Sequence, residues 1–301
     1  MLSIKGVGLG AITPFNNDDT IDIEGVRTNL DFALKNGVHS ISPVATSGEG
    51  SLLSPDEYGN VVRNVIEYVN GKVPVTPGVP GGTPKPIIKT IRMIQDLGAD
   101  AAYLSTPGYT KPTQEGLLAH FSMILSSVDL PVVIYNAIHR SGVDMSPEVV
   151  EKLSNQFSNF VGYKEPSLLK MGKIKHLAGN KLNLISEDWL FLPALSLGAS
   201  GVASVVANVV PRKVADIYDN FTKGRLEEAR KLQIELIPLM DLVGIGAGGR
   251  DTSPAPIKAA MNMVGLAAGS PRLPLVAASE ETRAELKILL SRLIPTMKVA
   301  T

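Results

Sequence analysis

The sequence contains no cysteine among its 301 residues. Disulfide bonds, thiolate nucleophiles and thiolate-bound metal ions are therefore excluded as sources of stability or chemistry. Histidine is scarce as well, and its four copies lie far apart without the short spacings of a metal site. We predict a protein that holds no metal ion.

The sequence also lacks an excess of charge of either sign, and it lacks long apolar runs. Twenty-nine basic residues balance 29 acidic ones, so no basic surface for nucleic acid is expected. No apolar stretch reaches the roughly 18–20 residues that span a bilayer. The first residues lack the charged and apolar regions of a secretory signal. We therefore predict a cytoplasmic protein with neither a membrane nor a nucleic-acid partner.

Short apolar runs alternate with amphipathic helical stretches along the first two thirds of the sequence. Eight runs are predicted as buried strands: Val7–Ile12, Ser40–Val44, Val73–Pro77, Ala101–Leu104, Val132–Tyr135, Phe160–Tyr163, Leu182–Ile185 and Gly201–Val205. Seven helices are predicted between and after them: Ile23–Lys35, Pro55–Val69, Pro84–Leu97, Thr113–Ser127, Pro147–Gln156, Leu168–Leu177 and Trp189–Leu197.

Helix boundaries are marked by residues that favour helix ends. Four residues are predicted as N-caps: Asp22, Ser54, Thr83 and Ser146. Four glycines follow helical stretches as stops: Gly37, Gly71, Gly98 and Gly198. These signals support the division into repeated strand–helix units.

Eight strand–helix units with strands apolar on both faces indicate a parallel sheet. Their number and the length of the chain favour a closed (β/α)₈ barrel, and an open doubly wound sheet is the alternative. Three further helices are predicted after residue 222, over Leu226–Val243, Pro256–Gly265 and Glu280–Pro295. We expect residues 1–222 to form the barrel and 223–301 a helical extension, with the glycine-rich run 244–250 as a flexible link.

Lys164 closes the buried strand predicted at Phe160–Tyr163. Burying an unpaired ammonium costs several kcal/mol, so an amine in this position is often kept for chemistry. Loss of water can lower the pKa of a lysine from about 10.4 towards 7–8, which leaves a neutral nucleophile able to form a Schiff base. The alternative is a lysine that extends to solvent at the strand's end.

In such a barrel the catalytic groups lie at the carboxyl ends of the strands, here called the rim. Tyr135 and Lys164 end neighbouring strands there, and a tyrosine hydroxyl could carry protons for a Schiff-base lysine. Thr46, Ser47 and Gly48 form a tight loop whose N–H groups could bind a carboxylate. The alternatives are a core aromatic for Tyr135 and an ordinary strand–helix turn for the loop.

Four motifs together resemble the dihydrodipicolinate synthase/N-acetylneuraminate lyase family. They are Ala45-Thr46-Ser47-Gly48-Glu49, Ser105-Thr106-Pro107-Gly108-Tyr109, Ile134-Tyr135-Asn136 with His139-Arg140-Ser141-Gly142, and Gly162-Tyr163-Lys164-Glu165. The resemblance runs in order from Gly8 to about Lys258. It implies a barrel with a C-terminal helical extension, usually a homotetramer built as a dimer of dimers. It also implies a lysine–pyruvate Schiff base and no cofactor.

The resemblance assigns roles to individual residues. Lys164 would form the Schiff base, and Tyr135, Thr46 and a Tyr109 from a neighbouring subunit would relay protons. Further residues would contact the small-molecule substrates: Thr46, Ser47, Gly48, Arg140, Glu187 and Ala203. Arg140 matches the arginine that binds the carboxylate of aspartate semialdehyde in the synthases.

Some positions depart from the family pattern. Ala45 stands where the first glycine of the usual motif lies, and Glu187 stands where the rim usually has a small residue. Glu187 could repel a second substrate carboxylate or accept hydrogen bonds from sugar hydroxyls. Pro55, Tyr58 and Gly108 match the bacterial lysine-inhibition site poorly, so we do not expect feedback inhibition by lysine.

The leading hypothesis is a lyase that activates pyruvate and condenses it with aspartate semialdehyde, as 4-hydroxy-tetrahydrodipicolinate synthases do. One alternative keeps the mechanism but acts on 2-keto-3-deoxy sugar acids, as an aldolase, a dehydratase or an N-acetylneuraminate lyase-like enzyme. Another alternative is a non-catalytic barrel that senses a small molecule. Arg140 favours the synthase, whereas Glu187 favours the sugar-acid enzymes.

Overall fold

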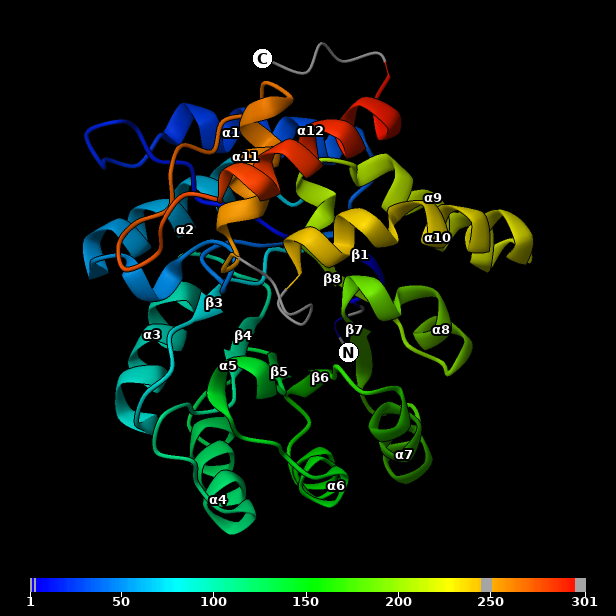
Figure 1. Cartoon of the computed structure of the whole chain (residues 1–301). Helices are drawn as coiled ribbons and strands as arrows, with labels where there is room; N and C mark the ends of the chain where they lie inside the picture. Colours follow the sequence, from blue (N-terminus) through cyan, green and yellow to red (C-terminus); the bar gives the residue numbers. More distant parts are fainter. Residues whose placement is uncertain (1, 3, 245–250, 296–301) are drawn as a thin grey trace.

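The computed structural model describes residue 2, residues 4–244 and residues 251–295. Eight parallel strands form its centre, and helices surround them (Figure 1). The strands are β1 Gly6–Gly10, β2 Ser40–Ser42, β3 Gly78–Val79, β4 Ala102–Ser105, β5 Val132–Tyr135, β6 Phe160–Lys164, β7 Asn183–Ser186 and β8 Gly201–Ser204.

The strand order is that of a barrel: β2-β1-β8-β7-β6-β5-β4-β3. The remaining gap, between β2 and the segment before β3, is bridged by a parallel pairing of Ile41 with Val75. The Ile41 amide donates to the Pro74 carbonyl at 2.9 Å, and the Thr76 amide donates to the Ile41 carbonyl at 2.8 Å. The (β/α)₈ prediction is confirmed, and the open-sheet alternative is wrong.

The helices follow the predicted order with two additions. They are α1 Ile23–Lys35, α2 Pro55–Val69, α3 Pro84–Asp96, α4 Gln114–Leu125, α5 Ile138–Ser141, α6 Pro147–Gln156, α7 Leu168–Ala178, α8 Phe191–Ser196, α9 Pro211–Thr222, α10 Leu226–Val243, α11 Ala255–Met263 and α12 Glu280–Leu293. Short 3₁₀ turns lie at η1 Gly50–Leu52, η2 Asp188–Leu190 and η3 Val206–Asn208. The added helices are α5 and α9.

The third predicted strand is wrong in position. Val73–Pro77 was expected, but β3 comprises Gly78–Val79. Pro74 and Pro77 have no amide proton, so this stretch cannot donate a regular ladder of hydrogen bonds. The helix predicted over Trp189–Leu197 is also divided, into η2 and α8.

Helix ends agree with the predicted signals except at one N-cap. The side chains of Asp22, Ser54 and Ser146 accept amide protons from the first turns of α1, α2 and α6. Thr83 occupies the N-cap of α3 without such a bond. The four stop glycines all have positive φ, at 86°, 72°, 92° and 86° in chain order. This left-handed backbone is favourable for glycine.

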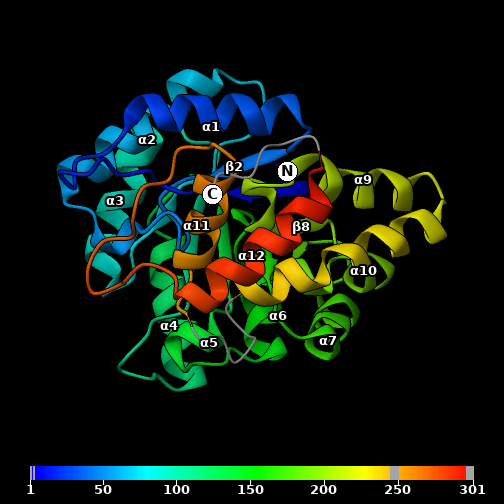
Figure 2. The same cartoon turned by 45° about the horizontal axis from the view of Figure 1, so that its top comes forward.

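The last three helices pack together against the barrel. Figures 1 and 2 show α10 beside α9, with α11 and α12 next to α10. Since α9 ends at Thr222 and α10 begins at Leu226, the proposed domain boundary falls in the short link between them. Residues 245–250 of the glycine-rich run lie outside the described residues. Within the described ranges, no helix is long and apolar enough to cross a membrane.

Alternation along β5 separates two apolar clusters. Val132 and Ile134 belong to the large cluster beneath the helices, whereas Val133 and Tyr135 belong to a small cluster inside the barrel. The register with β6 shifts after Val132, so that Tyr135 pairs with Lys164. A register shift of this kind changes the direction of the side chains that follow it. Here Tyr135 and Lys164 both line the same pocket.

Candidate active site

A cavity of about 510 Å³ opens at the rim of the barrel. Seven strands contribute residues at or next to their carboxyl ends: Gly10, Ser42, Val79, Ser105, Tyr135, Lys164 and Ala203. Loops between these strands and the following helices contribute the remaining walls. The polar residues that the sequence places on the rim therefore surround one pocket, as expected for a (β/α)₈ barrel.

Lys164 is buried at the end of β6, and only 6% of its surface is accessible. Its Nζ atom lies 2.7 Å from Oε2 of Glu187. The same atom lies 4.2 Å from the centre of the Tyr135 ring. An ion pair and an aromatic face thus compensate for part of the lost hydration. The alternative of a lysine extending to solvent is wrong.

The Tyr135 hydroxyl donates a hydrogen bond to Oε1 of Glu187 at 2.8 Å. Burial raises the pKa of Tyr135, and the negative charge of Glu187 raises it further. Tyr135 therefore keeps its proton in this environment and can lend it to a reacting oxygen. The core-aromatic alternative is incomplete, because the buried Tyr135 lines the cavity and its hydroxyl bonds Glu187, another residue of the cavity wall.

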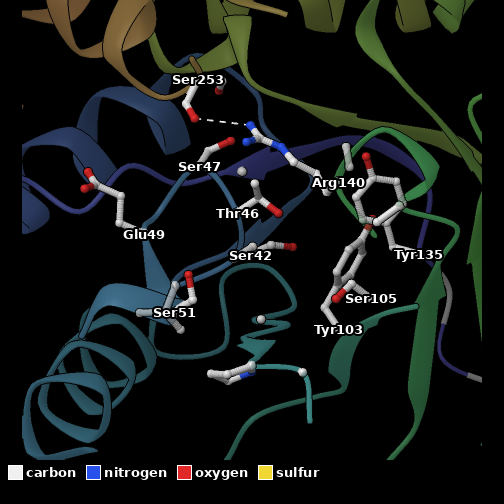
Figure 3. Close-up of a pocket in the computed structure, with 18 of the residues that line it drawn as sticks. Ser42, Thr46, Ser47, Glu49, Ser51, Tyr103, Ser105, Tyr135, Arg140 and Ser253 are labelled. Carbon is white, nitrogen blue, oxygen red and sulfur yellow. Dashed lines mark hydrogen bonds between the residues drawn. The ribbon is translucent and has the colours of Figure 1, made fainter. Parts of the chain in front are cut away.

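Tyr103 was not expected from the sequence. It projects from β4 into the same small cluster, with its ring centre 6.4 Å from that of Tyr135 (Figure 3). Its buried hydroxyl finds no hydrogen-bond partner among the residues that the structure describes. Burial, and then the charge of Glu187, raise the pKa of Tyr103. Tyr103 lies two residues before Ser105, and alternate residues of a strand face the same side. This alternation could have placed Tyr103 inside the barrel.

Glu187 contacts both Lys164 and Tyr135. It follows β7 directly, its residue is 3% exposed, and each of its carboxylate oxygens contacts one partner. Glu187 was expected on the rim from the sequence, but its contact with Lys164 was not expected. Twenty-three positions separate the two residues, and no local spacing pattern links them.

The next residue, Asp188, anchors this segment. Its Oδ2 atom accepts the amide protons of Val205 and Val206 at 2.8 and 3.3 Å, which ties the end of β7 to the end of β8. Its backbone oxygen accepts a proton from the Gln233 side chain on α10 at 3.1 Å. Burial raises the pKa of Asp188 to about 6.

The loop after β2 has a strained, closely packed backbone. Val44 and Glu49 have φ values of 50° and 55°, which side chains rarely adopt, and for a β-branched valine this conformation is an outlier. A Cβ on Gly48 would lie 2.7 Å from the Ala11 carbonyl oxygen. The Thr13 hydroxyl donates to the Gly48 carbonyl at 2.7 Å. These contacts hold the loop in one shape.

Thr46 and Ser47 both line the cavity from this loop. Thr46 is exposed and Ser47 is buried. Figure 3 shows Thr46 across the pocket from Tyr135. The single hydroxyl proton of Tyr135 goes to Glu187 rather than to Thr46. The Thr46–Tyr135 step of the expected relay stays a prediction.

A buried ion pair supports the loop, with Glu49 in the cavity wall and Lys258 behind it. Nζ of Lys258 on α11 lies 2.6 Å from Oε1 of Glu49, and both side chains are almost fully buried. The other oxygen of Glu49 accepts the Arg272 amide proton at 2.8 Å. Burial lowers the pKa of Lys258 despite the opposing effect of Glu49. The helical extension thus contributes directly to the shape of the loop.

Arg140 enters the cavity from α5, a short helix that was not predicted from the sequence. Its guanidinium donates to the Ser253 carbonyl at 3.2 Å, as Figure 3 shows. Burial lowers the pKa of Arg140. An arginine remains charged in proteins, so Arg140 offers a cation to an anionic substrate.

Tyr109 does not join the other residues. It is 99% exposed and is not part of the cavity wall, although its neighbour Gly108 is. Ala203 lies on β8 in the wall, as expected. Lys164, Tyr135, Thr46, Ser47, Arg140 and Glu187 are thus brought together, and Tyr109 stays apart.

Among residue 2, 4–244 and 251–295, no group of three or more histidine or acidic side chains has the geometry of a metal site. The chemistry available from the described side chains is that of a lysine nucleophile, hydroxyl donors, a carboxylate and a guanidinium.

Comparison with known proteins identifies the family. The model of the dihydrodipicolinate synthetase family matches residues 3–293. The chain belongs to this family.

Relatives of this family member match over nearly their whole length. A 4-hydroxy-tetrahydrodipicolinate synthase of Methanocaldococcus jannaschii is 39% identical over 292 residues, which cover 96% of this chain and 98% of the relative. A dihydrodipicolinate synthase structure from Aquifex aeolicus has a TM-score of 0.93 at 30% identity, covering 99% of this chain and 100% of that one. The family resemblance stated from the sequence is therefore confirmed.

A third similar structure concerns assembly. It is described as the first monomeric dihydrodipicolinate synthase variant, with a TM-score of 0.91, 32% identity and 96% coverage of both chains. A monomeric form of a synthase with this fold has thus been characterised, and the fold of this family member does not by itself fix how many subunits assemble.

Proposed function

We propose that the protein is a pyruvate-dependent Schiff-base lyase, and specifically a 4-hydroxy-tetrahydrodipicolinate synthase. The observation that carries this proposal is Lys164 Nζ, a buried amine at the floor of the rim cavity with the Tyr135 ring 4.2 Å away. Relatives named for this activity at 39% identity support the choice of reaction.

Pyruvate would lie between Lys164 and the loop after β2. The Lys164 amine attacks the ketone carbon, and loss of water gives an iminium that becomes an enamine when a methyl proton leaves. Thr46 and Ser47, with the amide of Gly48, would hold the pyruvate carboxylate. The enamine then adds to the aldehyde carbon of the second substrate.

Arg140 would position the second substrate. Its guanidinium lies in the cavity wall and can bind a carboxylate with two parallel hydrogen bonds. Aspartate semialdehyde carries such a carboxylate next to its reactive aldehyde chain. Replacing the guanidinium by an ammonium in Arg140→Lys would weaken this contact, because a lysine cannot make the paired bonds.

A specific observation also favours the second candidate, an enzyme of 2-keto-3-deoxy sugar acids. Glu187 places a carboxylate in the cavity wall, where it would disfavour a second substrate carboxylate and accept hydroxyl protons. However, both oxygens of Glu187 already have partners within the protein, which lowers their availability to a sugar. We therefore retain the synthase as the first proposal.

The assay that separates these candidates supplies pyruvate with aspartate semialdehyde in one arm and a panel of 2-keto-3-deoxy sugar acids in the other. The proposal predicts turnover with aspartate semialdehyde, and a large loss of kcat/KM for that substrate in Arg140→Ala. Turnover of the sugar acids alone would exclude the synthase. A protein that binds pyruvate without forming a covalent adduct would instead be a sensor.

We also propose a homotetramer built as a dimer of dimers, in which Tyr109 of each subunit completes the site of a neighbour. The 99% exposure of this aromatic side chain supports a partner that covers it. A monomer in solution with full activity would contradict the proposal. The cytoplasmic location stays a prediction.

A further inference from the structure

We propose that Glu187 is an acid–base catalytic residue that moves protons between Lys164, the substrate and Tyr135 within a single subunit. This inference rests on the Schiff-base chemistry of the proposed function. It assigns a role that a small residue at this position could not perform.

The contact geometry is that of a continuous proton path. Nζ of Lys164 is 2.7 Å from one oxygen of Glu187, and the hydroxyl of Tyr135 is 2.8 Å from the other. Both distances are within the range of strong hydrogen bonds to a charged group. One carboxylate therefore links the Lys164 amine to the Tyr135 hydroxyl.

The position of Glu187 is fixed by its neighbours on both sides. The Ser186 hydroxyl donates to the Gly201 carbonyl at 3.3 Å, and Asp188 accepts the Val205 amide proton at 2.8 Å. Two backbone attachments between β7 and β8 thus flank the glutamate. A catalytic group on rigid strand ends is already close to its working position, so little free energy is needed to orient it.

The protons balance along this path. Glu187 takes one proton from the Lys164 ammonium, and the neutral amine attacks the ketone carbon of pyruvate. The second amine proton moves to the former carbonyl oxygen by way of Tyr135. The carbinolamine hydroxyl then leaves as water with the proton that Glu187 returns through Tyr135. The products are an iminium with one proton on nitrogen, one water and the Glu187 carboxylate.

The same carboxylate can serve the carbon–carbon step. It accepts a methyl proton from the iminium, which yields a neutral enamine. When the enamine carbon bonds to the aldehyde carbon, the aldehyde oxygen receives that proton and the iminium forms again. No oxidant, reductant or additional co-reactant is needed.

Exchange of the pyruvate methyl protons for deuterium tests the inference without a second substrate. Wild-type protein in D₂O should exchange these protons, as followed by NMR, because the iminium and enamine interconvert. Glu187→Gln keeps the shape but cannot accept a proton, so the exchange rate should fall by at least about 100-fold. Glu187→Asp should retain part of the rate.

Glu165→Gln is the matched control. Glu165 is also a buried carboxylate, it directly follows Lys164, and it binds Asn136 and Ser167 outside the cavity wall. Its exchange rate should stay within about threefold of wild type. Equal exchange rates in Glu187→Gln and wild type would overturn the inference.

A second variant covers the case in which the glutamine disturbs folding. Glu187→Ala leaves space for a small carboxylate, and added formate should restore exchange in proportion to its concentration. Circular dichroism monitors the fold of each variant. Wild-type exchange in the alanine variant without formate would also overturn the inference.

These results are separable from a failure of the proposed function. If borohydride traps no pyruvate on Lys164 of the wild-type protein, the Schiff-base mechanism itself is wrong. If trapping and methyl exchange occur in the wild type but are unchanged in Glu187→Gln, the mechanism stands and the role of Glu187 is wrong.

Discussion

At the residue scale, the site combines groups that are unfavourable to bury singly. Lys164 and Glu187 lie together in a barrel interior, and each compensates the charge of the other. Removing one member of a buried pair leaves an unpaired charge, which typically costs about 3–5 kcal/mol. The chemistry and the stability of the protein are therefore coupled at this pair.

Lys164→Ala should abolish the pyruvate adduct and also destabilise the fold, because Glu187 loses its cation. We expect the free energy of unfolding to fall by about 3 kcal/mol. Adding Glu187→Gln should recover most of this loss, since the glutamine carries no charge. Urea denaturation of the two single variants and the double variant measures the coupling, and strictly additive effects would contradict the paired-charge account.

Glu165 should make stability depend on pH. Burial raises the pKa of Glu165 to about 7, above its ordinary value of 4.5. The folded protein therefore holds this proton more tightly than the unfolded chain, and its contribution to stability is lost as pH rises from about 4.5 to about 7. Glu165→Gln should remove this loss. Between pH 5 and pH 8 its free energy of unfolding should therefore rise by about 2 kcal/mol relative to that of the wild type. A pH-independent difference in urea denaturation would contradict this assignment.

Tyr103, Tyr135 and Lys164 show what residue-level reasoning could and could not predict. The strand ends placed Tyr135 and Lys164 on the rim, because parallel strands share one catalytic edge. The partner of their charges could not be predicted, since the contact with Glu187 depends on how β5, β6 and β7 are aligned. Tyr103 could have been found from the inward alternation of β4.

At the element scale, strand and helix signals worked where local chemistry dominates. The capping side chains and the positive-φ glycines fixed most helix boundaries. β3 was misplaced because two prolines interrupt the amide ladder, and its apolar residues gave no indication of this shift. The register shift between β5 and β6 was also invisible, because it follows from pairing between strands rather than from either strand alone.

The loop after β2 depends on α11, because Glu49 of the loop pairs with Lys258, which lies 209 positions later. Lys258→Ala would leave the Glu49 carboxylate buried without its cation, and we expect a loss of about 3 kcal/mol in the free energy of unfolding. The loop would also loosen, so KM for pyruvate should rise. The double variant with Glu49→Gln should be more stable than Lys258→Ala. Unchanged stability and KM in Lys258→Ala would contradict this role.

At the scale of the whole molecule, the barrel, its helical extension and its family followed from the order of short motifs and from the count of strand–helix units. The number of subunits did not follow, because a single chain contains no record of what covers Tyr109. Its near-complete exposure is consistent with a residue that acts outside its own subunit.

Mixing a variant of reduced activity with an inactive variant tests the shared site. Tyr109→Phe removes the donated hydroxyl, and Lys164→Ala removes the nucleophile. In a mixed oligomer, an intact Lys164 site can receive Tyr109 from a Lys164→Ala subunit, so part of the activity should return after unfolding and reassembly together. Activity that stays at the level of the separate variants, in oligomers shown to be mixed, would contradict the shared relay.

The central claim is that Lys164 forms a Schiff base with pyruvate. The most direct measurement is borohydride reduction of the wild-type protein with pyruvate, followed by peptide mass spectrometry. The account predicts one stable adduct, located on the peptide that carries Lys164 and absent from Lys164→Ala. No adduct, or an adduct on another lysine such as Lys258, would contradict it.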